Sequence, residues 1–331
     1  MTGPTRRKLM MAGLGAAAAL PLGVLALHGR LTVCQRLGAA FGTTMALTVL
    51  HSDKATGEAA LDASFAEIRA LERVASLFDA DSQVSRLNRD GRIADADSRL
   101  LELLSLSATV ASQTGGAFDI TVQPYWLAWA GARDHGRPAS DDELAAARAR
   151  VGLSGVVVDG AAVTLRTPGM GVTLNGIARG YATDRITAII KGYGIAHAFL
   201  NTDGVGAMGS KSGAPWTLAI QNPRDERSTL GEIRPVDGFV STSGDYEMAF
   251  SDDFRDNHIF DPATGRSPTE LASATIIAPS GALADGLSTA AMVMGAERTL
   301  ALVRTMPGVH AVLAAKSGAL TVTPGAPFVR S

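Results

Sequence analysis

The sequence has a single cysteine and almost no net charge, and each shortage excludes a class of function. Cys34 is the only cysteine among 331 residues, so an internal disulfide, a cysteine zinc site and a CxxC redox pair are excluded. Lysine and arginine number 30 against 32 aspartates and glutamates, which gives a formal charge of −2. This balance provides no general field for nucleic acid, so we expect no nucleic-acid partner. The chemistry must depend on oxygen and nitrogen groups.

Several common enzyme motifs are also missing. The sequence contains no HExxH, GxSxG or Walker lysine motif, so the usual zinc protease, serine hydrolase and P-loop classes have no support. Gly204, Gly206 and Gly209 spell GxGxxG, but KSGAPW follows where a dinucleotide-binding fold needs a helix. We expect a glycine-rich loop or hairpin there. The histidines without ligand-like spacing are expected to be ordinary surface or core residues: His28, His51, His135, His197 and His310.

The first thirty residues have the composition of a targeting segment. Arg6, Arg7 and Lys8 precede an apolar stretch from Leu9 to Leu27, which is typical of a twin-arginine (Tat) export signal. We therefore expect a signal at residues 1–30, a catalytic domain at residues 31–331 and a periplasmic location. An uncleaved signal that tethers the protein to the membrane, and lipidation of Cys34 in LTVC, stay open as alternatives.

The composition and the residue spacing favour one catalytic unit with two lobes. A hydrophobic content of 46% supports a sizeable core. The polar stretch Gly131–Glu143 is the expected soft joint. Predicted strands and helices do not alternate regularly, which favours an α+β fold with mixed sheets over a doubly wound parallel sheet. Helices are expected at 57–77, 98–112, 141–150, 181–191, 283–294 and 297–305, and strands at 41–50, 156–159, 162–166, 198–201, 217–221, 239–241, 274–278 and 309–314.

Asp285 and Thr289 form the most informative pair in the chain. They stand four residues apart in ADGLSTAAMVMG, so in a helix their oxygens lie one above the other on one face. A hard divalent cation prefers such oxygen groups. His258 opens a second polar run, HIFDPATGRSP, not far upstream. We interpret the two segments as a phosphate and metal site.

Three further segments have the composition of ligand-binding loops. GGAFDITVQPYW from Gly115 is interpreted as a turn that enters a strand and passes close to a planar ring, with Asp119 holding a polar edge. LNGIARGYATD from Leu174 is a glycine-rich turn running into a helix, whose free amides can receive phosphate oxygens, and Arg179 adds a positive charge. STSGDY from Ser241 is expected to be a polar turn. A tight turn or a plain helix start explains the glycines equally well.

Taken in order, these segments resemble the ApbE family of FAD:protein FMN transferases. FGTT at Phe41 is similar to the family's MGT strand, FDADSQVSRLN at Phe78 is similar to its dSxxSxxN segment, and the other segments follow in the family's order. The resemblance extends over residues 41–295 and implies an ApbE-like fold related to the T-fold. LNGIARGY, together with the twin-arginine signal, is most similar to the NosX-type branch.

The resemblance implies Mg²⁺-dependent transfer of FMN from FAD to a threonine hydroxyl of an acceptor protein, with release of AMP. It implies that His258 accepts the hydroxyl proton. It also implies that Asp285, Ser288, Thr289 and a main-chain oxygen near Gly176 hold the metal; Ser288 replaces an aspartate of some relatives and lowers the negative charge. The residues implied to contact the flavin, adenine or phosphate are Phe41, Phe78, Ala117, Phe118, Asp119, Arg179 and Ile259.

The implied acceptor is a membrane-bound respiratory flavoprotein, NosR-like for the NosX-type branch. Two other functions stay open. A Mg²⁺-dependent FAD pyrophosphatase would use water as the nucleophile in the same pocket and release FMN and AMP. A non-catalytic periplasmic flavin carrier or assembly factor would need only the pocket. Asp261 is expected to shape the DPATG turn and to take no part in the chemistry.

Overall fold

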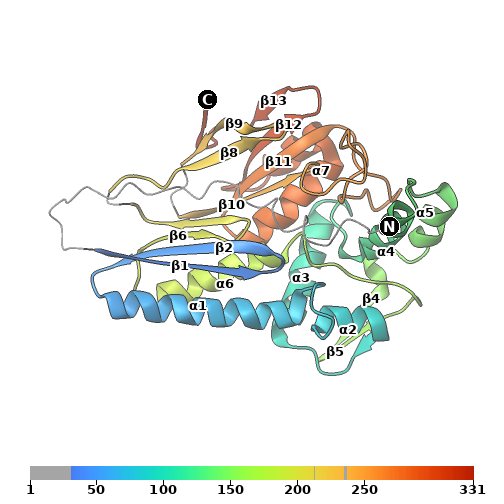
Figure 1. Ribbon diagram of the computed structural model, residues 1–331, viewed down its shortest axis with the longest axis horizontal. Helices are drawn as coiled ribbons and strands as arrows, with labels where there is room; N and C mark the ends of the chain where they lie inside the picture. The colour runs from blue at the N-terminus through green and yellow to red at the C-terminus, as the bar shows by residue number, and fades with distance from the viewer. Residues whose placement is uncertain (1–30, 212, 235–236) are drawn as a thin grey trace, which may run out of the picture.

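An eight-stranded antiparallel sheet forms the centre of the molecule (Figure 1). The computed structural model describes residues 31–211, 213–234 and 237–331. In the order in which they pair, the strands are β1 (Thr32–Ala40), β2 (Thr43–His51), β6 (His197–Asn201), β7 (Val205–Met208), β10 (Gly238–Gly244), β11 (Leu271–Ala278), β12 (His310–Ala315) and β13 (Leu320–Val322). All neighbours in this order are antiparallel.

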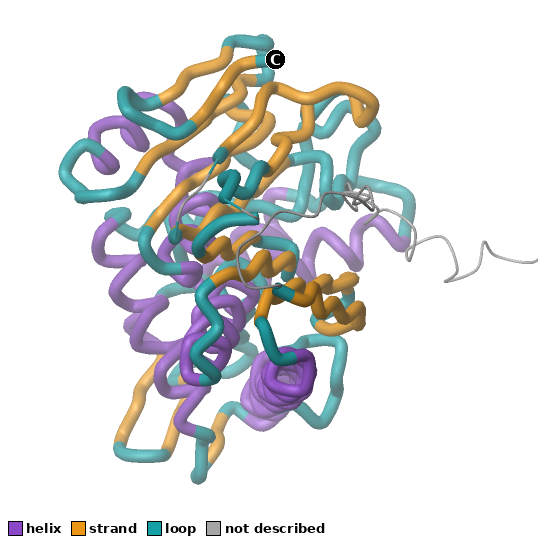
Figure 2. Tube along the Cα trace, turned by 90° about the vertical axis from the view of Figure 1, so that its left-hand side faces the viewer, coloured by secondary structure: helices purple, strands orange, loops and turns teal. Residues whose placement is uncertain are grey.

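Three long helices cover one face of this sheet: α1 (Lys54–Ala75), α6 (Ala178–Gly192) and α7 (Gly281–Val303). Figure 2 shows α1 end-on below the strands. In α1 the apolar residues Leu61, Ile68 and Leu71 recur at helical spacing, and all three are buried. Helix α7 packs on β10 and β11 and turns sharply at Gly295, which has φ 75°.

A second, small sheet covers the opposite face of β10 and β11. It consists of β14 (Phe328–Arg330), β9 (Asp225–Ile233) and β8 (Leu218–Asn222), and β8 and β9 are drawn above β10 in Figure 1. Ile220 and Ile233 pack against Val240 of β10 and Ile277 of β11. Because β11 is covered on both faces, all eight of its residues are buried, including Ser273 and Thr275.

The remaining elements flank the helical face. They are α2 (Gln83–Asp90), α3 (Ser98–Gln113), α4 (Gln123–Asp134), α5 (Asp141–Arg148), the 3₁₀ turns η1 (Ile120–Val122) and η2 (Leu153–Gly155), and a three-stranded sheet of β3 (Arg92–Ile93), β5 (Ala162–Leu165) and β4 (Val156–Asp159). The α+β class predicted from the sequence is confirmed. So are the predicted hairpin at GxGxxG, formed by β6 and β7, and all six predicted helices, two of them merged in α7.

Two strand predictions near the N-terminus need correction. The strand expected at 41–50 begins at Thr43, because Phe41 and Gly42 form the turn of a hairpin with φ of 52° and 77°. The first strand of that hairpin, β1, was not predicted. Its sequence lies beside the expected signal and mixes polar with apolar residues, because its outer face is exposed. The predicted signal at 1–30 lies outside the described residues.

Three loop predictions need correction. GGAFDITVQPYW contains no strand: Asp119 caps η1, and α4 begins at Gln123 with Pro124 in its first turn, where a missing N–H has no penalty. STSGDY is a turn only at Asp245 and Tyr246, because Ser241–Gly244 is the end of β10. Gly131–Glu143 is not a joint, because Ala139 between α4 and α5 is buried in a common cluster of the two helices.

The N-terminal ends of α6 and α7 lie in direct backbone contact. A Cβ atom at Gly180 would overlap the carbonyl oxygen of Gly281 and would come within 2.7 Å of Cβ of Asp285. Asp184 of α6 joins the two helices by accepting hydrogen bonds from Ser280 Oγ at 2.9 Å, from the N–H of Gly281 at 2.6 Å and from the N–H of Ala282 at 2.9 Å. Asp184 of α6 thus caps two N–H groups at the start of α7, in addition to the N-cap Ser280, whose Oγ accepts from the N–H of Leu283.

In the described part of the chain, no helix is both long enough and apolar enough to span a bilayer.

We expect Gly180→Ala to destabilise the protein by about 1–3 kcal/mol, because the added methyl group must push α6 and α7 apart. Gly192→Ala is the matched control: it lies at the end of the same helix, and no atom lies within 4 Å of its added Cβ. The measurement is the free energy of unfolding in urea. Equal free energies for the two variants would contradict the close contact.

Candidate functional site

The N-terminal part of α7 places a buried carboxylate against α6 and β10. Asp285 is 4% exposed. One carboxylate oxygen accepts a hydrogen bond from the N–H of Gly180 at 3.0 Å, and the other accepts one from Ser241 Oγ at 3.0 Å. Burial raises the pKa of Asp285, and the charge of Arg179 and these two hydrogen bonds oppose that rise. The carboxylate therefore joins three elements that are far apart in the sequence.

Ser288 and Thr289 meet the same end of β10, one turn further along α7. Ser243 Oγ lies 2.8 Å from Ser288 Oγ and 3.3 Å from Thr289 Oγ1. Ser288 Oγ also donates to the main-chain oxygen of Asp285 at 2.9 Å. The predicted convergence of Asp285, Ser288 and Thr289 is thus present, with hydroxyl groups from β10 beside it.

Ser241 and Ser243 are site residues that the sequence interpretation missed. They stand two residues apart, and in a strand such residues point to the same face. Reading STSGDY as a strand would therefore have placed both hydroxyls together. The signal was present, but the small polar residues and the glycine of this segment are equally typical of turns.

Gly176 lies next to Thr289, as predicted for the metal site. A Cβ atom at Gly176 would come within 2.9 Å of Thr289 Oγ1 and 3.3 Å of the Phe118 ring. The absence of a side chain therefore leaves the main chain of the turn before α6 close to the hydroxyl. It also brings Phe118, a predicted cofactor contact, beside the polar cluster.

Arg179, in the first turn of α6, carries the charge that faces this cluster. Its Nε lies 3.2 Å from a carboxylate oxygen of Asp203. The geometry of that pair does not make a hydrogen bond, so Nε is a buried donor without a hydrogen-bond partner in the described part of the chain. Burial favours a lower pKa for Arg179, but Asp203, Asp285 and Glu247 raise it above its ordinary value.

Asp203 was not predicted as a site residue. It has φ 76°, a left-handed conformation that is uncommon for residues other than glycine. Such strain concentrates at functional sites. Burial and the Asp203 carboxylate raise the pKa of the neighbouring Glu247, while Arg179 lowers it. Arg179 thus lies among the carboxylates of Asp203, Glu247 and Asp285. A polyanionic ligand would have to compete with these carboxylates for the guanidinium.

His258 is held by a main-chain carbonyl group. Its N–H and its Nδ1 both lie within hydrogen-bonding distance of the Met248 oxygen, at 3.0 and 3.1 Å. Because a carbonyl oxygen can only accept, Nδ1 carries the proton and Nε2 keeps a free lone pair. Burial lowers the pKa of His258 to about 4, and Arg179 lowers it further against the hydrogen bond to Met248. His258 is therefore a neutral base at pH 7.

The residues predicted to contact the flavin or adenine ring form two groups. Phe41 is buried in the β1–β2 turn, whereas Phe78 is 70% exposed, and its ring would lie 3.0 Å from a Cβ at Gly42. The exposed ring therefore covers the turn that holds Phe41. Ala117, Phe118 and Ile259 belong with Phe41 to the main buried cluster.

Asp119 has a local structural role in addition to any role in binding. One of its carboxylate oxygens accepts from the N–H of Thr121 at 2.7 Å and from Thr121 Oγ1 at 2.6 Å. Burial raises its pKa, and these hydrogen bonds oppose the rise. Thr121 Oγ1 in turn accepts from the N–H of Gly152 at 2.8 Å, so Asp119 fixes the turn that follows Phe118.

The oxygen atoms of the polar cluster suit Mg²⁺. Asp285, Ser288 and Thr289 together with the main chain at Gly176 offer one carboxylate, two hydroxyls and peptide oxygens, and Mg²⁺ prefers such hard ligands. Mg²⁺ is commonly bound through one or two carboxylates, water and substrate phosphates. Across the described residues, no three His, Cys, Asp or Glu side chains gather into a cluster that would bind a metal alone. The donor set therefore fits a metal that is shared with a phosphate ligand.

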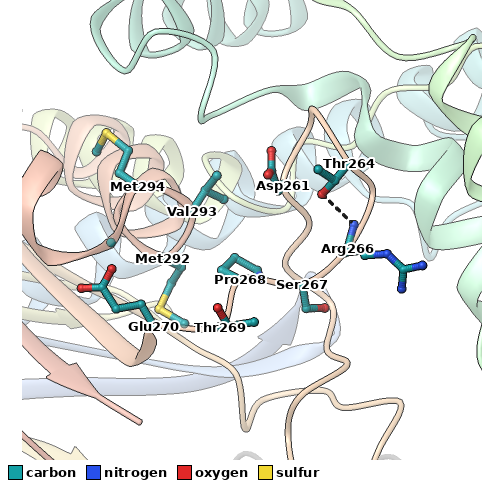
Figure 3. Close-up of a pocket in the computed structure, with 11 residues that line it drawn as sticks. Asp261, Thr264, Arg266, Ser267, Pro268, Thr269, Glu270, Met292, Val293 and Met294 are labelled. Atoms are coloured by element: carbon teal, nitrogen blue, oxygen red, sulfur yellow. Dashed lines mark hydrogen bonds between the residues drawn. The ribbon is translucent and has the colours of Figure 1, made fainter. Parts of the chain in front are cut away.

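A separate cavity of about 250 Å³ lies further along α7 (Figure 3). It is lined by Glu270, by Met292 to Gly295, and by the loop from Asp261 to Thr269, and none of the predicted site residues lines it. Asp261 accepts from the N–H groups of Ala263, Thr264 and Gly265, so its predicted role in the DPATG turn is confirmed.

The chain matches a known protein family over most of its length. The ApbE family model matches residues 41–313. A protein of Klebsiella pneumoniae (strain 342) named FAD:protein FMN transferase is 32% identical over 280 residues, which cover 81% of this chain and 80% of that protein. A Vibrio cholerae protein of the same name is 33% identical over 237 residues, which cover 69% of this chain and 71% of that protein.

Solved structures show the same fold. The ApbE protein from Thermotoga maritima has a TM-score of 0.80 and 29% identity, and the match covers 88% of this chain and 97% of that one. The Pseudomonas stutzeri flavinyl transferase ApbE in its apo form has a TM-score of 0.76 and 29% identity, covering 89% and 95%. The family model, the relatives and the fold agree, and this chain belongs to the ApbE family.

Proposed function

We propose that this chain is an FAD:protein FMN transferase that depends on Mg²⁺ and modifies a threonine hydroxyl of an acceptor protein. The observation that carries the proposal is the convergence, at the N-terminal ends of α6 and α7, of a buried carboxylate, two hydroxyls and an arginine with an unpartnered buried N–H. A pyrophosphate group offers an acceptor for the Nε–H group of Arg179, which has none among the described residues. The family's relatives carry the name of this activity.

The proposed reaction moves one phosphoryl group between two oxygen atoms. The threonine oxygen attacks the flavin-side phosphorus, the bond from that phosphorus to the bridging oxygen breaks, and AMP leaves with the bridging oxygen. The hydroxyl proton goes to Nε2 of His258, whose lone pair is free because Nδ1 donates to Met248. Arg179 would stabilise charge on the phosphoryl oxygens.

Asp285, Ser288, Thr289 and the main chain at Gly176 would hold Mg²⁺. Bound there, the ion would neutralise charge on the phosphate oxygens and act as a Lewis acid. Phe41, Phe78, Ala117, Phe118, Asp119 and Ile259 would surround the ring systems of FAD. The exposed Phe78 ring supports this, since a free aromatic face can stack on a planar ligand.

We further propose that the protein works in the periplasm after export through the twin-arginine pathway, on a membrane-bound respiratory flavoprotein. The support is the composition of residues 1–30 and the resemblance to the NosX-type branch. A NosR-like acceptor would fit that branch.

The two alternatives, a Mg²⁺-dependent FAD pyrophosphatase and a non-catalytic flavin carrier, would use the same pocket as the transferase. The products of one assay distinguish the three functions. The protein is incubated with FAD, Mg²⁺ and a candidate acceptor domain, and flavin fluorescence is recorded on a denaturing gel. A fluorescent acceptor band supports transfer, whereas free FMN without a band supports the pyrophosphatase. Bound but unchanged FAD supports a carrier.

We expect Asp285→Asn to lower the rate of flavin transfer by at least about 100-fold, because it removes the only carboxylate of the proposed metal set. The rate is measured as covalent fluorescence on the acceptor. Asp142→Asn, an exposed change on α5, is the control and should keep the wild-type rate. EDTA should abolish wild-type transfer and added Mg²⁺ should restore it; an EDTA-resistant reaction would contradict the metal assignment.

We expect His258→Gln to lower transfer by about 100-fold to 10,000-fold while FAD still binds, because the change removes the base but leaves the phosphate and ring contacts. Binding is measured by the quenching of flavin fluorescence. A variant that transfers FMN at the wild-type rate would exclude His258 as the base.

We expect the His258 ring to show no titration between about pH 5.5 and 8 in NMR spectra of the free protein. Burial lowers its pKa to about 4, so the ring is neutral above that value and gains a proton only as the pH falls through it. The His258→Gln variant assigns the signal. A midpoint near pH 6.5 would show that the ring is solvated and not buried.

A further inference from the structure

A buried carboxylate outside the phosphate cluster binds two cations from distant segments. Asp245, directly after β10, has a fully buried side chain. Its two carboxylate oxygens each accept from a terminal nitrogen of Arg224 at 2.7 Å, and one of them lies 3.3 Å from Lys316 Nζ. Arg224 lies in the turn between β8 and β9, and Lys316 directly follows β12.

Both cations also hold the loop that connects Asp245 to His258. Lys316 Nζ donates to the main-chain oxygen of Phe254 at 3.2 Å, and the Arg224 guanidinium lies 5.0 Å from the centre of the Phe254 ring. Phe254 has φ 58°, which is rare for a bulky residue and needs surrounding contacts to persist. The two cations provide such contacts.

Two routes of contacts connect this loop to His258. The Phe254 oxygen also accepts from Asn257 Nδ2 at 3.2 Å, and Asn257 is buried immediately before His258. The second route is Met248, which lies in the same loop and whose oxygen accepts from His258 Nδ1. On its far side the loop is fixed by Phe250, whose ring stacks on Trp129 with a centroid distance of 5.5 Å.

Stability alone is a weak explanation for such a cluster. Removing charges from water is costly, so a buried ion pair often stabilises a protein no more than apolar residues of the same size would. What the pair does provide is fixed geometry, because a bidentate arginine allows one orientation of the carboxylate. Here the fixed segment supplies the carbonyl oxygen that sets the tautomer of His258.

We propose that Asp245, Arg224 and Lys316 are positioning residues that hold the loop 246–257 so that His258 keeps its proton on Nδ1 and its lone pair on Nε2. The role in catalysis rests on the proposed function, in which Nε2 accepts the hydroxyl proton. The effect on the tautomer does not, and it can be measured without substrate.

The test compares Arg224→Gln and Lys316→Met with wild type by ¹⁵N NMR of the histidine rings, whose nitrogen shifts report which atom carries the proton. Arg227→Gln is the matched control: Arg227 is exposed on the neighbouring strand β9, and in the described chain its side chain forms no ion pair. We expect wild type and control to show the Nδ1–H form, and both test variants to show a mixture of tautomers.

In the transfer assay we expect kcat of the two test variants to fall at least about 10-fold, because loss of an oriented base removes part of a contribution of about 100-fold to 10,000-fold, with KM for FAD within about twofold of wild type. Arg224→Lys keeps the charge but loses the bidentate pair of hydrogen bonds to Asp245. It is therefore a milder second variant, and we expect a tautomer mixture between those of wild type and Arg224→Gln. An unchanged tautomer in variants that melt at lower temperature would overturn the proposal, since the cluster would then only stabilise. A changed tautomer in the test variants, together with a wild-type protein that transfers no FMN, would uphold the positioning role and reject the proposed function.

Discussion

The contact between Gly180 and Gly281 is the constraint on which the site depends. Two helices can share backbone contact at their N-terminal ends only where both lack a side chain. The contact brings the N–H of Gly180 to the carboxylate of Asp285 and lets Asp184 cap the neighbouring helix. The contact thereby brings the Arg179 guanidinium, the buried carboxylate of Asp285 and the hydroxyls of Ser288 and Thr289 into one cluster, where the proposed phosphate and metal site lies.

The central sheet fixes the other half of the site. Strand β10 carries Ser241 and Ser243 on one face, directed at α7, and then delivers Asp245 to its buried ion cluster. His258 comes back to this strand end through a loop that is packed between the ion cluster and the aromatic residues of α4. A single strand thus aligns the helix ends that carry the proposed phosphate site with the loop that carries the proposed base.

Much of this site was accessible from the sequence. The spacing of Asp285 and Thr289 predicts a shared helical face, and LNGIARGYATD predicts a helix start; the structure contains both. The amides at that start are not free as predicted, because the N–H of Gly180 donates to Asp285 and the N–H groups of Ile177 and Ala178 donate to Leu174. The turn predicted at Ser241–Gly244 is a strand, because short segments of small polar residues suit turns and strands equally and tertiary packing decides between them. After the predicted turn at Gly115 and Gly116, the strand expected in GGAFDITVQPYW is a 3₁₀ turn and the start of α4. Strand β1 was missed since its outward face is exposed and its pattern is weak.

The sequence by itself determined which chemical groups are available, the α+β class and the helices other than α2 and α4, because these follow from residue type and local periodicity. Only the tertiary structure decided that Arg179 lies beside Asp203, that Phe78 covers the turn at Phe41, and that Asp245 pairs with Arg224 and Lys316. Each of these pairs joins segments tens of residues apart. Their meeting depends on how the sheet and helices pack around a common core, and local spacing carries no information about that.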